Sequence, residues 1–233
     1  MKINKIIKEI NLLKNPQKAK ILARFFKTGK GEYGEGDIFL GITVPQQRSI
    51  AKRYSDLIFP DLQKLIESPI HEYRLICLLI LVEEYKKGSP KEKKNIVAFY
   101  LKNTKKINNW DLVDLSAHKI LGDYLLDKNK KIIYQLAESE NLWERRISIL
   151  TTFNFIGKGE FEDSLKIAEI LLNDKHDLIH KAVGWMLREI GKRDIEAEEV
   201  FLRKFHKSMP RTMLRYAVEK FEDKKRKYYL NKY

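Results

Sequence analysis

The stretch Leu142-Trp-Glu-Arg-Arg146-Ile-Ser-Ile149-Leu150 shows a pattern that recurs throughout this chain. Its apolar residues are spaced three and four apart, which is the spacing of one face of an α-helix. Arg146 falls between Leu142 and Ile149 on this apolar face, whereas Arg145 points aside. An ionisable side chain therefore interrupts the apolar face of a predicted helix.

Apolar spacings of three and four residues continue along almost the whole sequence. Alternating β-branched runs bounded by turn pairs, which indicate strands, are nearly absent. The sequence therefore predicts an all-α fold. The predicted helices cover residues 2–13, 16–28, 46–57, 60–67, 71–87, 90–103, 110–127, 129–138, 141–156, 160–173, 176–191, 195–206, 211–220 and 222–230.

An ionisable residue opens an apolar stretch five times, in the second helix of successive predicted helix pairs. The positions are Arg74, Asp114, Arg146, Lys181 and Arg215, separated by 40, 32, 35 and 34 residues. This loose period is close to those of HEAT-like and other helix-pair repeats, about 34–47 residues. We predict a right-handed superhelix of about six HEAT-like helix pairs, forming a single domain over residues 1–233. Equivalent positions in stacked repeats should line one surface, although each long side chain could also merely extend from the core rim to solvent.

The composition is that of a globular protein with a large positive charge. The 233 residues include 46 Lys and Arg against 32 Asp and Glu, a formal net charge of +14, and 43% of them are hydrophobic. This composition excludes disordered, collagen-like and disulfide-rich chains, and the charge favours an anionic partner. The longest apolar run, Leu75–Val82, is too short to span a membrane. Residues 1–14 do not resemble a secretory signal, and one apparently buried Cys77 favours a cytoplasmic location.

A glycine-rich segment over residues 28–37 interrupts the helical pattern. Gly29-Lys-Gly31-Glu-Tyr-Gly34 satisfies the G-x-G-x-x-G pattern of dinucleotide-binding sites. However, a predicted helix precedes it, no strand leads into it, and no βαβ unit follows. The segment is therefore expected to be a flexible loop near the mouth of a groove.

Asn109-Trp-Asp-Leu-Val-Asp114 opens another predicted helix. Asn109 suits the N-cap, and Asp111 suits the first turn, where the helix dipole favours a negative charge. Asp114 has no such structural explanation, because it shares a helix face with Trp110 and borders the core. A partly desolvated carboxylate in this position would attract a cation strongly.

Two further side chains suggest a nucleic-acid surface. Arg146 requires a partner on its apolar face: either a carboxylate such as Asp114 in a buried ion pair, or a phosphate held by its planar guanidinium. Trp185 lies on the polar face of its predicted helix, beside Lys181 and Arg188. This arrangement suits a groove where an aromatic ring contacts sugar or base and cations hold phosphates, although packing between repeats would also explain the ring.

His176 and His180 are spaced four residues apart and could share a metal ion. No third ligand and no His-Glu-x-x-His pattern accompanies them, so we expect no metal site.

Four segments together resemble the AlkD-like DNA alkylation repair family. They are Asn109–Asp114, Asn141–Arg146, Lys181–Glu189 and Phe39–Arg48, and the resemblance extends from about Ala23 to Tyr216. It implies a superhelix that cradles duplex DNA and hydrolyses the glycosidic bond of purines alkylated at ring position 3 or 7, without a cofactor. Neutral lesions would then be poor substrates.

The resemblance also assigns roles to individual residues. Asp114 matches the catalytic carboxylate of the family, Trp110 and Trp185 its flanking aromatic residues, and Arg146 its site arginine. A family tyrosine near the site is replaced by Phe25, and the loop at 29–36 is longer than the family pattern. The side chains expected to contact DNA are Lys181, Arg188, Arg211, Arg215, Arg74 and Arg48.

Two other functions remain open at this stage. A non-catalytic repeat protein would bind duplex DNA through the same charge but release no base. A protein-binding scaffold would have little affinity for nucleic acid and an exposed apolar patch. We expect a monomer without a membrane partner in each case.

Overall fold

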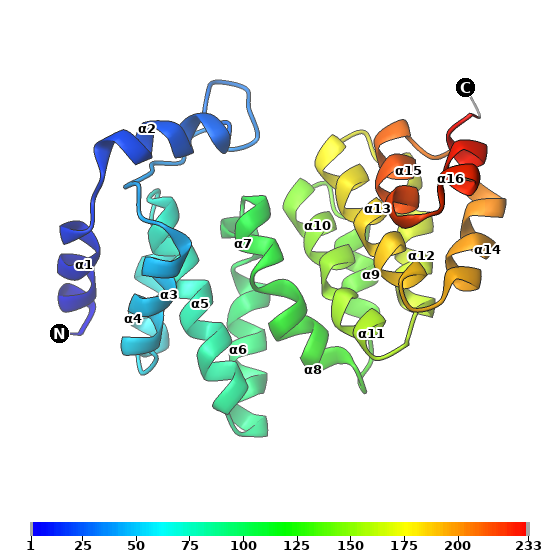
Figure 1. The fold of residues 1–233 in the computed structure, drawn as a ribbon. Helices are drawn as coiled ribbons and strands as arrows, with labels where there is room; N and C mark the ends of the chain where they lie inside the picture. Colours follow the sequence, from blue (N-terminus) through cyan, green and yellow to red (C-terminus); the bar gives the residue numbers. More distant parts are fainter. Residues whose placement is uncertain (1, 232–233) are drawn as a thin grey trace. The chain divides into compact units, whose positions relative to one another are not determined.

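The computed structural model describes residues 2–231, and their regular secondary structure is helical. No strand occurs among them, and the only β-like pairing described is an isolated bridge between Ile38 and Ile70. The prediction of an all-α fold is confirmed. The chain separates into two compact units, with the division between Ser116 and Ala117. We describe each unit by itself (Figure 1).

The first unit contains seven α-helices and one short 3₁₀ turn. They are α1 (Lys2–Leu12), α2 (Pro16–Phe25), α3 (Val44–Arg53), α4 (Phe59–Ile66), α5 (His71–Lys87), α6 (Pro90–Lys102), η1 (Thr104–Lys106) and α7 (Trp110–Asp114). Capping residues start several of them. The Asn15 side chain accepts from the Lys18 N–H ahead of α2, and Ser89 forms a capping box with Glu92 ahead of α6.

Helix α5 is the centre of the first unit. Its side chains from Leu75 to Val82 are all buried, which is why its sequence is apolar on every face. It packs against α3, α4, α6 and α7. The thiol of Cys77 lies inside this core.

Glu72, in the first turn of α5, ties a non-helical segment to this core. Its buried carboxylate accepts the backbone N–H groups of Leu40, Gly41 and Ile42 at 2.8–3.2 Å. Gly41 has φ of +84°, and a Cβ atom there would lie 2.2 Å from the Asn15 carbonyl oxygen, so only glycine fits. Glu72 therefore fixes the path of the chain between α2 and α3.

The second unit repeats helix pairs. Its elements are η2 (His118–Gly122), α8 (Asp123–Leu125), α9 (Lys131–Ala137), α10 (Leu142–Thr151), α11 (Phe153–Gly157), α12 (Glu162–Ile170), η3 (Leu171–Asn173), α13 (Asp177–Gly191), α14 (Ile195–Phe205), α15 (Arg211–Ala217), η4 (Val218–Lys220) and α16 (Asp223–Leu230). Helix α13 packs against α10, α12, α14 and α15. Gly184 lets α13 and α15 approach closely, because a Cβ atom there would lie 2.4 Å from the Met213 carbonyl oxygen.

Two predicted helices are interrupted. The helix expected over 110–127 ends at Asp114, and a π-helical turn, η2, follows it. The Ser116 hydroxyl donates to the Leu112 carbonyl at 2.6 Å, a side-chain bond that competes with the regular helical pattern. In the same way Thr152 donates to the Ile149 carbonyl at 2.7 Å where the helix expected over 141–156 divides into α10 and α11.

The five repeat positions occupy equivalent places in their helices. Arg74 is the fourth residue of α5, and the other four, Asp114, Arg146, Lys181 and Arg215, are each the fifth residue of α7, α10, α13 and α15. They are not equally exposed, because Arg74 and Arg146 are buried whereas Arg215 is exposed. The continuous superhelix and the single domain over residues 1–233 stay predictions.

The membrane expectation can be compared directly with the helices. Within residues 2–231, no helix combines the length and the apolar character that crossing a bilayer requires.

Glu198 yields a prediction about stability. Its side chain in α14 is 1% exposed, and burial together with nearby Glu199 raises its pKa to about 9. Above pH 4.5 an unfolded chain releases this proton while the folded chain keeps it, so folding stability falls as the pH rises toward 9. Glu198→Gln should therefore stabilise the protein, by on the order of 2 kcal/mol at pH 8, with no gain at pH 4. Thermal unfolding at several pH values measures this, with exposed Glu138→Gln as the control; a gain that is the same at pH 4 and pH 8 would contradict it.

Glu72 yields a second prediction. Glu72→Gln should lower the free energy of unfolding by roughly 2–3 kcal/mol, because it replaces charge-assisted bonds to buried N–H groups and turns a donor toward them. Urea unfolding at pH 7 measures the loss. The exposed Glu67→Gln serves as the matched control and should change the free energy by less than about 0.5 kcal/mol. Equal stability of the two variants would show that Glu72 does not hold the segment.

Candidate functional site

Trp110 and Asp114 are the first and last residues of α7. The Asn109 side chain caps this helix by accepting the Trp110 N–H at 2.8 Å, as the sequence predicts. Both side chains are half-buried, and both line a cavity of about 460 Å³ inside the first unit. The lining also includes α2, the segment that Glu72 holds, and the start of α5. Asp114 therefore lies at an accessible cavity rather than wholly within the core.

Aromatic rings form most of one wall of this cavity. The indole of Trp110 stacks on Phe26, with centroids 5.0 Å apart and planes 24° apart, and Phe26 stacks on Phe39 at 5.1 Å. The ring of Phe25 meets Trp110 edge-on at 5.8 Å and is 61% exposed. The position where the family tyrosine is expected thus carries an exposed ring beside Trp110. These contacts fix the indole plane and leave its surroundings mostly apolar.

His71 lies at the end of this stack. Its ring is 1% exposed and stacks on Phe39 at a centroid distance of 4.5 Å. Nδ1 lies 3.1 Å from Asp37 Oδ2, and Nε2 lies 2.9 Å from Asp111 Oδ2. Burial by itself would lower the pKa of His71, but the carboxylates of Asp111 and Asp37 outweigh it and raise the pKa to about 8. The ring is therefore mainly protonated at neutral pH.

Asp37 closes the glycine-rich segment and carries a second ion pair. Its Oδ1 lies 2.7 Å from Arg74 Nη2 and accepts from the Asn108 side chain at 3.2 Å. Burial tends to raise the pKa of Asp37, but the hydrogen bond from His71 and the charge of Arg74 lower it overall. Arg74 also donates to the Ser68 carbonyl at 2.7 Å. The Arg74 side chain is only 4% exposed and is paired within the first unit, and its contact with DNA stays a prediction.

The glycine-rich segment itself has little capacity for a phosphate. The backbone N–H of Gly29 donates to Glu32, and that of Gly31 donates to Glu35, both at 2.8 Å. The amides that a dinucleotide would use are thus occupied by carboxylates of the same loop, which agrees with the expectation against such a site.

Sequence analysis missed Asp37, His71 and Glu72 as members of this site. A signal was present, because His71 and Glu72 are two ionisable residues directly before the most apolar helix of the chain. Charged groups there need buried partners, and the partners lie 30 to 40 residues away along the sequence. Asp111, which the helix dipole already explained, has the further role of bonding to His71.

Arg146 and Trp185 belong to the second unit. Arg146 is buried in α10, and its Nη1 donates to the Leu178 carbonyl at 2.5 Å. Trp185 is half-buried, packs against Phe153 with centroids 5.6 Å apart, and donates from Nε1 to Glu189 at 3.3 Å. Both side chains are thus oriented by contacts within the second unit.

The remaining predicted DNA contacts differ in exposure and pairing. Lys181 pairs with Asp177 at 2.6 Å, and Arg188 pairs with Glu219. Arg211 is exposed and donates to the Leu230 carbonyl. Arg215 is exposed in α15, and Arg48 is half-exposed in α3. Cations in solvent-exposed ion pairs can exchange their partners for phosphates at small cost.

The two histidines considered as metal ligands have other contacts. His176 Nδ1 accepts the Leu178 N–H at 3.1 Å, and the His180 ring contacts the Asp174 carbonyl. In the described part of the chain, no group of three His, Cys, Asp or Glu side chains is arranged to hold a metal ion.

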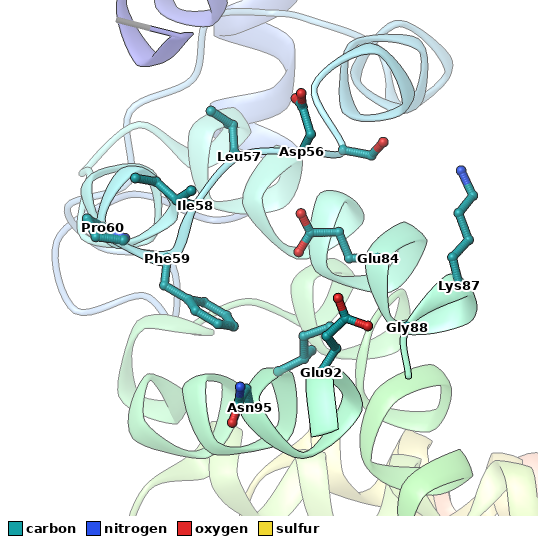
Figure 2. Close-up of a pocket in the computed structure, with 12 residues that line it drawn as sticks. Asp56, Leu57, Ile58, Phe59, Pro60, Glu84, Lys87, Gly88, Glu92 and Asn95 are labelled. Carbon is teal, nitrogen blue, oxygen red and sulfur yellow. The ribbon is translucent and has the colours of Figure 1, made fainter. Parts of the chain in front are cut away.

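A second cavity of the first unit, of about 540 Å³, has a different character. Figure 2 shows Phe59 and the carboxyl groups of Glu84 and Glu92 along it. Burial and the neighbouring charges of Asp56 and Glu92 raise the pKa of Glu84 to about 7. A cavity rich in carboxylates repels phosphate, so it does not suit a nucleic acid.

Comparison with known proteins assigns the chain to a family. The model of a family described as DNA alkylation repair enzyme matches residues 6–221. A solved structure described as a predicted DNA alkylation repair enzyme from Enterococcus faecalis has a similar fold, with a TM-score of 0.70 and 19% identity over 90% of this chain and 97% of that chain. No curated protein matches the sequence. Because the family match covers nearly the whole chain, the protein belongs to the DNA alkylation repair enzyme family.

Proposed function

We propose that this protein is a DNA glycosylase that removes cationic 3- or 7-alkylated purines from duplex DNA. The observation that carries the proposal is the half-buried carboxylate of Asp114, one helical turn from the fixed indole of Trp110 and at the edge of an aromatic cavity. Family membership supports a role in the repair of alkylated DNA.

The residue types suit the chemistry of this substrate class. An alkylated purine of this kind carries a positive charge, so the C1′–N9 bond breaks with its electron pair moving to the base, which leaves as a neutral molecule. No general acid is needed. The sugar left behind has oxocarbenium character, and a fixed carboxylate stabilises that charge while orienting the attacking water, as the second carboxylate of glycosidases does. Water adds to C1′ and its proton leaves to solvent.

Trp110 would contribute through its electron-rich face. An indole beside a cationic sugar or base contributes about 0.5–2 kcal/mol when the site is partly desolvated. The stack with Phe26 holds the ring in one orientation before DNA arrives, so little rotamer entropy is lost on binding. We assign Trp185 the same role from the family resemblance.

The second unit would supply much of the affinity for duplex DNA. We assign Arg146 to a backbone phosphate near the lesion, and Lys181, Arg188, Arg211 and Arg215 to phosphates along the duplex, with Arg48 from the first unit. A protein with a formal charge of +14 releases many counterions when it binds DNA. Such contacts position the protein but carry no sequence information.

Non-catalytic DNA binding is the second candidate function. The observation that favours it is Phe25, an apolar ring where the family pattern has a tyrosine hydroxyl. Both candidates predict duplex binding, and only the glycosylase predicts base release.

Asp114→Asn tests the glycosylase directly. The amide has the same shape but no negative charge, so release of 7-methylguanine from methylated duplex DNA should fall roughly 10²- to 10³-fold while DNA affinity stays the same or rises. Chromatography of the liberated bases measures the rate. The exposed Asp127→Asn is the matched control and should keep the wild-type rate. An Asp114→Asn protein that excises as fast as wild type would remove Asp114 from the mechanism, and no release by the wild type would leave DNA binding as the function.

Salt titration tests the phosphate contacts. The logarithm of the association constant should fall linearly with the logarithm of salt concentration, with a slope of roughly −0.9 for each phosphate neutralised. Arg215→Gln should make this slope less steep by about 1 and weaken binding equally for damaged and undamaged duplexes. An unchanged slope would show that Arg215 does not contact the backbone.

A further inference from the structure

We infer that His71 is a positioning residue for base excision: by bridging Asp37 and Asp111 it holds the first turn of α7, and with it Trp110 and Asp114, in the reactive geometry. This inference rests on the proposed function. It adds a residue outside the set that would touch DNA.

The two contacts of the ring define its protonation state. Each ring nitrogen faces a carboxylate oxygen, Asp37 at 3.1 Å and Asp111 at 2.9 Å. A carboxylate can only accept a hydrogen bond, and a neutral imidazole has one N–H. Both bonds therefore exist only when the ring is an imidazolium, and loss of the proton leaves one buried carboxylate opposite a lone pair.

The charges around the ring favour that state. The charged side chains that act on the ring are Asp37 from the loop, Asp111 from α7 and Arg74 from α5. The other ionisable side chains that line the same cavity are Asp114 from α7, Glu72 from α5 and Lys18 from α2. Arg74 opposes the imidazolium but is itself paired with Asp37 at 2.7 Å. The balance gives the pKa of about 8 described above, so the bridge is intact at pH 7 and is lost as the pH rises through 8.

His71 reaches the reactive residues by two routes. The first is the hydrogen bond to Asp111, which lies directly between Trp110 and the rest of α7 in the chain, and whose other oxygen accepts the Leu112 N–H at 2.8 Å. The second is the ring stack, in which the ring centroid of Phe26 lies 5.2 Å from that of His71 and 5.0 Å from that of Trp110. Both routes end on the same short helix.

Helix α7 depends on such anchors because it has five residues and ends before an interruption. A helix of that length has almost no stability of its own in water. Small displacements of a catalytic group are costly, since an error near 1 Å can reduce a rate about 100-fold. Weakening the bridge should therefore slow excision before it unfolds the protein.

The test compares wild type with His71→Gln in single-turnover release of 7-methylguanine from pH 6 to 9.5. The ratio of the two rates at each pH cancels any titration of the substrate. We expect wild type to be roughly 10- to 100-fold faster at pH 6.5 and the ratio to fall toward 1 above pH 8. His206→Gln, in the second unit, is the matched control and should give a ratio near 1 throughout. A merely structural histidine would give a ratio that does not change with pH while both proteins stay folded.

A measurement that does not depend on catalytic activity separates this inference from the proposed function. Nitrogen-15 NMR of the five histidines should show His71 protonated on both nitrogens at pH 7, titrating near 8, and Asp111→Asn should lower that value. The titration of His71 in the wild-type protein decides whether the bridge exists, so the result does not depend on whether a variant folds. A His71 that titrates at 6.5 or below, or a rate ratio that is flat with pH, overturns the inference. If NMR finds the bridge but wild type releases no base, the proposed function fails instead.

Discussion

The imidazolium of His71 between two carboxylates is the interaction on which the architecture of the first unit depends. It joins three segments that are far apart in sequence: the end of the glycine-rich loop at Asp37, the start of α5, and the first turn of α7 at Asp111. The loop at Asp37 and the short helix α7 would not hold their own positions, so the bridge ties both of them to α5. Placing one cation between two anions satisfies all three charges inside a region from which water is excluded.

A buried ionic network of this kind contributes less to stability than its number of contacts suggests. Removing charges from water is costly, and an apolar core of equal volume is often as stable. What the network supplies is a defined arrangement, because His71, Glu72 and Arg74 each bind specific groups of other segments. Glu72 fixes residues 40–42 and Arg74 binds Asp37, so two side chains from the first turn of α5 define the path of the segment between α2 and α3. Helix α5 is apolar and buried from Leu75 to Val82, and the polar residues of its first turn position the segment that lines the cavity.

The sequence predicted the helices well and the site in part, and the difference has a physical cause. Apolar periodicity is a local property, so the all-α fold and the equivalent places of Asp114, Lys181 and Arg215 in their helices could be read from spacing alone. The interruption after α7 could not be predicted in this way, because it depends on whether a hydroxyl group such as that of Ser116 donates to a backbone carbonyl. The bridge at His71 and the burial of Arg74 could not either, since their partners are set by tertiary packing across 30 to 40 residues. From its charge alone, Arg74 was expected to contact DNA in the same way as Arg215, although Arg74 is buried and Arg215 is exposed.

The proposed chemistry suits a candidate site in which the half-buried carboxylate of Asp114 lies beside an aromatic wall. A lesion that is already cationic needs no proton, so a general acid would add nothing to the departure of the base. It needs instead an anion, and the aromatic rings of Phe25, Phe26 and Trp110 line the same cavity as Asp114, where apolar surroundings strengthen the attraction between opposite charges. A neutral lesion would be a poor substrate, because the departure of its base would need a proton and the imidazolium of His71 is held by Asp37 and Asp111. Selectivity for charged lesions would then follow from the charge of the lesion itself, and the positive charge of the protein would act on the phosphates of the duplex.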